Sequence, residues 1–85
     1  MKRIAVIGIV LEEPAKHQDE FNTVVSEYND IIKGRMGLPF SEENIGIISI
    51  AVVAEMDKIN SLTGRLGKIP DISVKTAVSK KEVNR

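Results

Sequence analysis

Two short segments combine glycine with cationic side chains, a pattern that can bind a small anion. They are Gly64-Arg65-Leu66-Gly67-Lys68 and Gly34-Arg35-Met36-Gly37. Glycine lets a ligand or another backbone approach closely, and arginine and lysine supply positive charge. Neither segment has the GxxxxGK[ST] spacing of a phosphate-binding loop. The candidate ligand contacts are Gly64, Arg65, Gly67, Lys68, Arg35 and Gly37. The competing interpretation is a helix stop with close packing for the first segment and an ordinary edge strand for the second.

Residue types that support catalysis or metal binding are sparse. The chain has no cysteine and one histidine, His17, which excludes a thiolate site and a multi-histidine centre within one chain. We interpret His17 as a partly covered rim residue of a first helical turn, with a metal site shared between chains as the alternative. Glu12 and Glu13 are adjacent on a chain leaving a strand and would point apart, which disfavours a paired acid–base site. We expect no catalytic residue, no metal ligand and no cofactor.

Composition limits the size of the fold and the classes of partner. Eighty-five residues form one small domain that buries only about 60% of its unfolded surface, so association would help to stabilise it. Twelve basic residues balance twelve acidic residues, so no long-range field attracts nucleic acid or an anionic membrane. The start of the chain imitates a signal peptide, but its apolar run meets Glu12 and Glu13 instead of small residues. We expect a cytoplasmic protein without direct nucleic-acid or membrane partners.

The elements that must position these residues are organised around two apolar strands. Residues 45–54 contain eight residues from the set Ile, Val and Ala, and residues 3–11 are similarly apolar. Such runs are too short to cross a bilayer, and their β-branched content favours strands. Alternate residues of a strand face opposite ways, so both faces of each strand must be covered. Helices can cover one face, and we expect a second copy of the chain on the other. The expected interface face carries Ile48, Ile50 and Val52.

The remaining elements follow from periodicity and from turn residues. An amphipathic helix is predicted from Pro14, with an apolar stripe from Phe21 to Ile32. Residues 33–38 form an irregular edge strand, and a second helix from Met56 to Leu66 ends at Gly67 as a left-handed stop. The last strand covers residues 72–79. We expect one domain at residues 1–79 and a charged, frayed tail at residues 80–85.

The order strand, helix, strand, strand, helix, strand predicts an α+β, ferredoxin-like βαββαβ sandwich. Its sheet is antiparallel with four strands in the spatial order 4-1-3-2, and both helices lie on one face. This order places the first and third strands in the centre, which agrees with their apolar character on both faces. The helix-free face would expose more apolar surface than a monomer normally does. We therefore expect a homodimer or a tetramer, packed sheet to sheet or joined edge to edge.

Three segments carry a resemblance to a known family. GRMGLP at residues 34–39, IISIAVV at 47–53, and LTGRLGKIP at 62–70 running into ISVKT resemble the iron-only hydrogenase system regulators. The resemblance covers essentially the whole chain. That family is similar in fold to the C-terminal effector domain of nickel-responsive repressors and to ACT domains. The chain departs from those repressors in two ways: its first strand is predicted to begin at residue 3, so we expect no DNA-binding domain before it, and it has His17 alone.

The resemblance implies an ACT-like regulatory module linked to [FeFe]-hydrogenase maturation. The first hypothesis is a non-catalytic module that homo-oligomerises through its sheet and senses a small anionic ligand or an amino acid at subunit interfaces. The alternative is a ligand-free interaction protein that docks to a hydrogenase-maturation protein or to a separate DNA-binding regulator. An enzyme is the third hypothesis, and the sequence disfavours it because no nucleophile, base and orienting group are spaced so that they could act together in catalysis.

Overall fold

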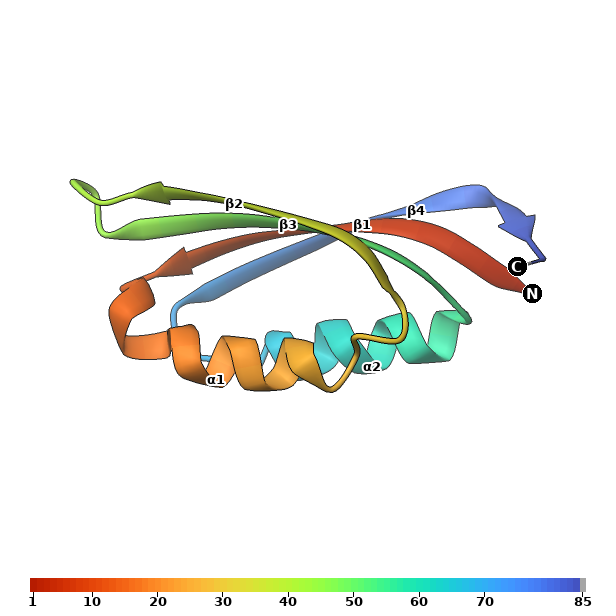
Figure 1. The fold of residues 1–85 in the computed structure, drawn as a ribbon, viewed down its shortest axis with the longest axis horizontal. Helices are drawn as coiled ribbons and strands as arrows, with labels where there is room; N and C mark the ends of the chain where they lie inside the picture. The colour runs from red at the N-terminus through yellow and green to blue at the C-terminus, as the bar shows by residue number, and fades with distance from the viewer. Residues whose placement is uncertain (85) are drawn as a thin grey trace.

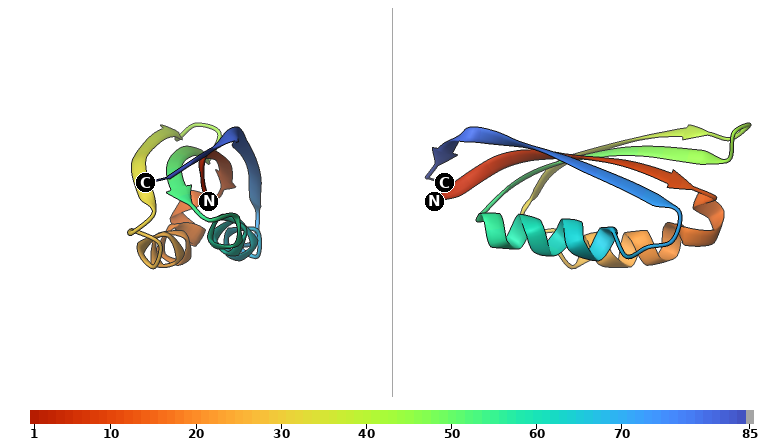
Figure 2. Two further views of the ribbon diagram at one scale, coloured as in Figure 1. Left: turned by 90° about the vertical axis from the view of Figure 1, so that its right-hand side faces the viewer. Right: turned by 180° about the vertical axis from the view of Figure 1, so that it is seen from behind.

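The computed structural model describes residues 1–84 and forms one antiparallel sheet with two helices. The strands stand in the order β2-β3-β1-β4, and both helices lie side by side on one face of the sheet (Figures 1 and 2). The predicted ferredoxin-like α+β fold and its strand order are therefore confirmed. In chain order the elements are β1 (Lys2–Glu12), α1 (Pro14–Ser26), β2 (Ile32–Phe40), β3 (Ile45–Ala54), α2 (Met56–Leu66) and β4 (Ile72–Val83).

The molecule is elongated, with extents of 42 × 18 × 17 Å. A strand rises about 3.3 Å per residue and a helix about 1.5 Å, so the sheet is longer than the helices beneath it. The start of β1 and the end of β4 lie together at one end of the sheet, and the β2–β3 hairpin lies with the start of α1 at the other (Figure 1). No helix within residues 1–84 has the length and hydropathy needed to cross a bilayer.

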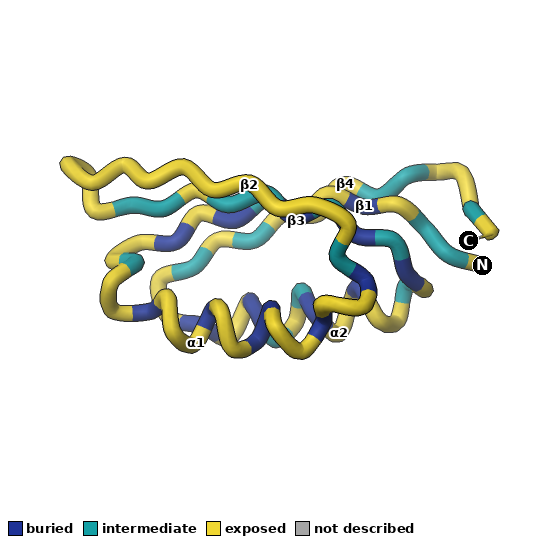
Figure 3. The backbone as a smooth tube through the Cα atoms, viewed as in Figure 1, coloured by how far each residue is buried: buried dark blue, intermediate teal, exposed yellow. Residues whose placement is uncertain are grey.

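The core lies between the sheet and the two helices (Figure 3). Alternate residues of β1 and β3 point into it, and the helices contribute the apolar stripes predicted from their periodicity. Its main members are Ala5, Ile7, Ile9 and Leu11 of β1, Ile50, Val52 and Ala54 of β3, Phe21, Val24 and Val25 of α1, and Ile59, Leu62 and Leu66 of α2.

The predicted interface face of β3 is wrong. Ile50 and Val52 are 0% exposed beneath the helices, and Ile48 is partly buried against the same core. Both faces of β3 are apolar, so the hydrophobic pattern alone could not tell which face the helices would cover. Ile50 pairs with Ile7 of β1, so the two share a face, and the 0% exposure of both shows that the helices cover this face.

Several boundaries also differ from the predictions. The helix α1 ends at Ser26, and the stripe residues Tyr28 and Ile31 are buried in the following turn. Gly67 has φ −63°, so α2 ends in right-handed geometry rather than at a left-handed stop. The strand β4 continues to Val83, so most of the expected frayed tail is paired strand, and Arg85 lies outside the described residues.

Candidate functional site

The helix-free face of the sheet is the largest apolar surface on the described chain. Partners across an antiparallel ladder share a face, so the pairings assign each side chain to one side of the sheet. Seven of the eight exposed large hydrophobic residues belong to this face, which we call the open face. They are Ile4, Val6 and Val10 of β1, Met36, Leu38 and Phe40 of β2, and Ile47 of β3.

The open face carries no charged side chain in the interior of its three adjoining strands β1, β2 and β3. Along β1, charged residues stand on this face only at the two ends, Lys2 and Glu12. The small residues Gly8, Ser49 and Ala51 lie at the centre, where Gly8 pairs with Ser49 and Val6 with Ala51. On the edge strand β4, Lys75 stands on the same face opposite Gly8. The apolar surface of β1, β2 and β3, bordered by these charges, is suited to packing against another protein surface.

Arg65, a predicted ligand contact, is engaged by its own chain. Its guanidinium donates two hydrogen bonds to the Glu27 carboxylate, at 2.8 Å and 3.1 Å, and lies 5.6 Å from the centre of the Tyr28 ring. The hydrogen bonds and charge of Arg65 lower the pKa of Glu27. A 2.7 Å hydrogen bond with Ser61, and then the Arg65 contact, lower the pKa of Tyr28. Arg65 therefore joins the end of α1 to α2.

The other predicted contacts do not converge with Arg65. Arg35 donates a hydrogen bond to Asn22 Oδ1 at 3.0 Å, and its guanidinium lies 5.3 Å from the centre of the Phe21 ring. A Cβ added at Gly64 would meet nothing within 4 Å, whereas one added at Gly67 would lie 3.3 Å from the Thr63 carbonyl oxygen. Gly64 and Lys68 are exposed. The structure thus places the two glycine-flanked segments apart, one at the end of α2 and the other in the edge strand β2.

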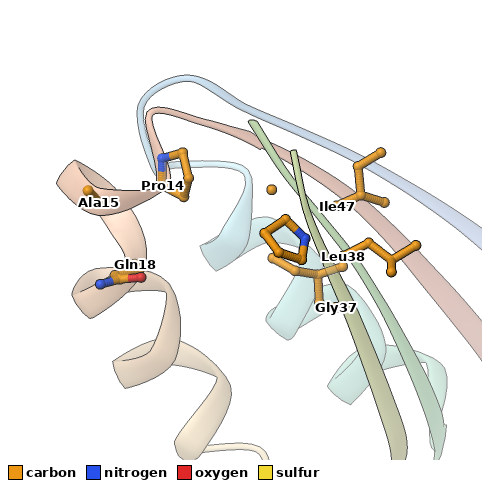
Figure 4. Close-up of a pocket in the computed structure, with 9 residues that line it drawn as sticks. Pro14, Ala15, Gln18, Gly37, Leu38 and Ile47 are labelled. Atoms are coloured by element: carbon orange, nitrogen blue, oxygen red, sulfur yellow. The ribbon is translucent and has the colours of Figure 1, made fainter. Parts of the chain in front are cut away.

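A cleft does lie beneath the β2–β3 hairpin, where the sheet overhangs the start of α1. It has a volume of about 380 Å³ and contains Gly37, the one predicted ligand residue in its lining. The side chains of Leu38 and Ile47 point away from α1 toward the open face (Figure 4). Gln18 is the single polar side chain in the lining of the cleft, so the cleft suits a small uncharged group better than an anion. The lining residues are Pro14, Ala15, Gln18, Gly37, Leu38, Pro39, Gly46, Ile47 and Ile48.

A second cluster, which the sequence reasoning missed, lies at the same end of the molecule. His17 is 6% exposed, and its Nε2 lies 3.2 Å from Asp71 Oδ2. One ligand atom from each of Glu13, His17 and Asp71 lies within 4.8 Å of the other two. The predicted rim position of His17 is therefore wrong, since its side chain is buried. No spacing signal could reveal the cluster, because 54 residues separate His17 from Asp71.

The backbone at this end adopts an unusual conformation. Glu13, Asn44 and Asp71 have positive φ values of 51°, 57° and 62°, which cost L-residues roughly 1–2 kcal/mol each. Hydrogen bonds brace these turns against one another: the Glu13 N–H donates to the Asn44 carbonyl at 2.9 Å, and the Glu12 N–H donates to the Asp71 carbonyl at 3.0 Å. The start of α1, the hairpin and the start of β4 are therefore tied together.

Comparison with known proteins gives a family assignment. A profile of the TM1266-like family, described provisionally as the iron-only hydrogenase system regulator, matches residues 3–76. The chain belongs to this family. The predicted family is thus confirmed over most of the chain. No curated protein matches the sequence.

Two solved structures compare with this TM1266-like chain. The uncharacterized protein TM1266 from Thermotoga maritima has a TM-score of 0.90 and 34% sequence identity, over 94% of this chain and 100% of that chain. SnoaB, a cofactor-independent oxygenase from Streptomyces nogalater, has a TM-score of 0.58 and 9% identity, over 99% of this chain and 97% of that chain. At that low identity, the second similarity shows a shared fold alone.

Proposed function

We propose that this protein is a non-catalytic regulatory module of an iron-only hydrogenase system, and that it works as a homodimer packed through the open face. Family membership supplies the biological context and supports a role other than catalysis. The observation that carries the proposal is the open face, which holds seven of the eight exposed large hydrophobic residues.

The exposed surface is slightly larger than that of a compact monomer of this mass. A compact monomer of 9.4 kDa has an accessible surface of about 5,000 Å² by size scaling. This chain alone exposes 5425 Å². The excess agrees with an elongated sheet that leaves one face uncovered.

The charge pattern favours a second copy as the occupant. A two-fold interface brings the same patch together from both chains, so a charged patch would meet its own charge. The interiors of β1, β2 and β3 avoid this repulsion because they carry no charge on the open face, and the charged Lys75 of the edge strand β4 lies beside them, opposite Gly8. If the two sheets pack with their β1 strands antiparallel, Lys2 of one copy faces Glu12 of the other, which fixes the orientation.

We further propose that the module senses a small ligand, and the cleft beneath the β2–β3 hairpin supports this. It is lined by β2 and β3, which also supply Leu38 and Ile47 to the open face. A ligand in the cleft would contact the same two strands that form the interface, and such shared elements can couple ligand binding to association. The lining indicates a small uncharged ligand. Small uncharged organic molecules that raise the melting temperature of the wild type in proportion to log concentration would support sensing, and zwitterionic amino acids provide the comparison.

Glutamate substitutions on the open face test the interface. Val6 is 45% exposed and Ile47 is 39% exposed, so Val6→Glu and Ile47→Glu leave the core intact and place a charge at the interface. We expect the wild type to sediment as a dimer and both variants to sediment as monomers with an unchanged circular dichroism spectrum.

The matched control is Asn60→Glu, which adds the same charge at an exposed position of α2. We expect this variant to remain a dimer. A wild-type chain that sediments as a monomer at high concentration contradicts the proposed dimer and leaves the open face to a different protein, such as a hydrogenase-maturation protein. If Val6→Glu and Ile47→Glu remain dimeric, the dimer interface lies on another surface.

A further inference from the structure

The end of the molecule that carries the hairpin also gathers three potential metal ligands from two distant segments. Glu13 lies between β1 and α1, His17 lies in the first turn of α1, and Asp71 directly precedes β4. The hydrogen bond from the Glu12 N–H to the Asp71 carbonyl fixes these two segments relative to each other. The cluster is therefore held in place by the fold and lies within one chain.

The separations in the cluster match those around a bound metal ion. Donor atoms that share one ion at about 2.0–2.2 Å lie roughly 3.0–3.6 Å from one another. His17 Nε2 and Asp71 Oδ2 already have this separation, at 3.2 Å. The Glu13 atom lies within 4.8 Å of both, and because Glu13 is exposed, rotation of its side chain can close the remaining gap.

The charges in the cluster are unbalanced. Within residues 1–84, neither Glu13 nor Asp71 forms an ion pair with lysine or arginine. Two carboxylates thus converge on one buried histidine without a permanent positive charge among them. The N-terminal end of α1 contributes only about half a positive charge. A divalent cation would neutralise both carboxylates.

The geometry points to a divalent transition-metal site formed by Glu13, His17 and Asp71, with Zn²⁺ as its representative ion. An imidazole nitrogen with two carboxylate oxygens is a donor set that Zn²⁺ accepts, and the imidazole selects against Mg²⁺ and Ca²⁺. The ion takes the place of the proton shared between His17 Nε2 and Asp71. Because Asp71 is about half exposed, with 49% of its side chain accessible, the ion can enter from solvent, and water completes its coordination.

Metal binding at this site can be tested without interference from other imidazole or thiolate ligands, because the chain has one histidine and no cysteine. Untagged protein, stripped with a chelator and then freed of it, is titrated with Zn²⁺ by calorimetry, and Co²⁺ is added separately to record its visible absorption. We expect one ion per chain and a Co²⁺ spectrum that Zn²⁺ abolishes. Glu13→Gln and Asp71→Asn should each weaken Zn²⁺ binding at least about 10-fold.

The variants separate the site from nonspecific binding and from misfolding. Glu13 is exposed and its side chain makes no hydrogen bond in the described structure, so Glu13→Gln removes a ligand without disturbing the core. Glu20→Gln, an exposed change on the same helix, should bind Zn²⁺ like the wild type. Absence of saturable binding by the wild type overturns the site, and so does wild-type affinity in either ligand variant. Because all three ligands come from one chain, these results do not depend on dimerisation.

Discussion

At the scale of single residues, the two arginines show how a binding pattern can serve the fold. Arg65 stands between glycines, and its guanidinium binds the Glu27 carboxylate and packs on the Tyr28 ring. Arg35 donates a hydrogen bond to Asn22. Their flanking glycines suggested an approaching ligand. The partner of a long cationic side chain depends on residues that only the tertiary structure brings close, and the neighbouring sequence does not reveal these residues.

The pairing of Arg65 with Glu27 predicts a pH-dependent stability. Arg65 lowers the pKa of Glu27 below its ordinary value of 4.5 in the folded state. The stabilisation is therefore fully present above pH 4.5 and is lost as the pH falls through the lowered pKa. We expect Arg65→Gln to destabilise the protein at pH 7 and the loss to shrink toward pH 3, as measured by urea unfolding.

The neutral contact of Arg35 provides the comparison. Arg35 bonds to the amide oxygen of Asn22, which does not titrate in this range. We expect the effect of Arg35→Gln to stay similar between pH 7 and pH 3. A pH-independent loss in Arg65→Gln would assign its contribution to packing on Tyr28 instead of to charge.

Gly64 offers a second prediction at this scale. It lies within α2, and an added Cβ would meet nothing within 4 Å. We expect Gly64→Ala to stabilise the protein by about 0.5–1 kcal/mol, because alanine loses less backbone entropy in a helix. Urea unfolding measures the change.

Gly67→Ala is the matched variant for Gly64→Ala. Its Cβ would lie 3.3 Å from the Thr63 carbonyl oxygen, so we expect no gain in stability. If Gly64→Ala destabilises the protein, a second chain or a ligand approaches the helix at that position.

At the scale of elements, β4 differs most from its prediction. Its alternating pattern ends near Ser79, yet the strand continues to Val83 after an irregular register between Arg3 and Ala5 of β1. The Ser79 hydroxyl bridges this irregularity: it accepts a hydrogen bond from the Ile4 N–H at 3.2 Å and donates one to the Lys81 carbonyl at 2.9 Å. At this irregularity, the hydrogen bonds of the Ser79 side chain therefore take the place of the regular backbone hydrogen bonds between β1 and β4.

The Ser79 bridge predicts a local effect of its removal. We expect Ser79→Ala to cost about 0.5–1.5 kcal/mol and to speed amide hydrogen exchange at residues 80–83, because the strand beyond the bridge loses its anchor. Exchange at residues 72–78 should not change. Ser73→Ala, on the same face of β4, serves as the control. Uniformly faster exchange along β4 would show that the bridge supports the whole strand.

At the scale of the molecule, the fold consists of a long sheet with only one face covered. The helices cover one face of β1 and β3, and the open face keeps its apolar side chains in solvent within a single chain. This arrangement also decides which residues can test the interface. Ile50→Asp would place a carboxylate in the core at a 0% exposed position and unfold the chain, so the interface is tested at Val6 and Ile47.

The sequence by itself determined the element order, the strand order and the central position of β1 and β3. These properties follow from local periodicity and from the rules that connect neighbouring elements. The boundaries Ile45–Ala54 and Met56–Leu66 were also predictable, since apolar runs there end at turn residues.

Only the tertiary structure decided which apolar face the helices cover, what the arginines bind and where Glu13, His17 and Asp71 meet. Each of these depends on contacts between residues far apart in the chain. A strand that is apolar on both faces has no pattern that selects one of them, and a turn at residue 71 has no local mark of its approach to residue 17. Packing of α1 and α2 on the sheet supplies that information by fixing the register and by bringing the distant turns together.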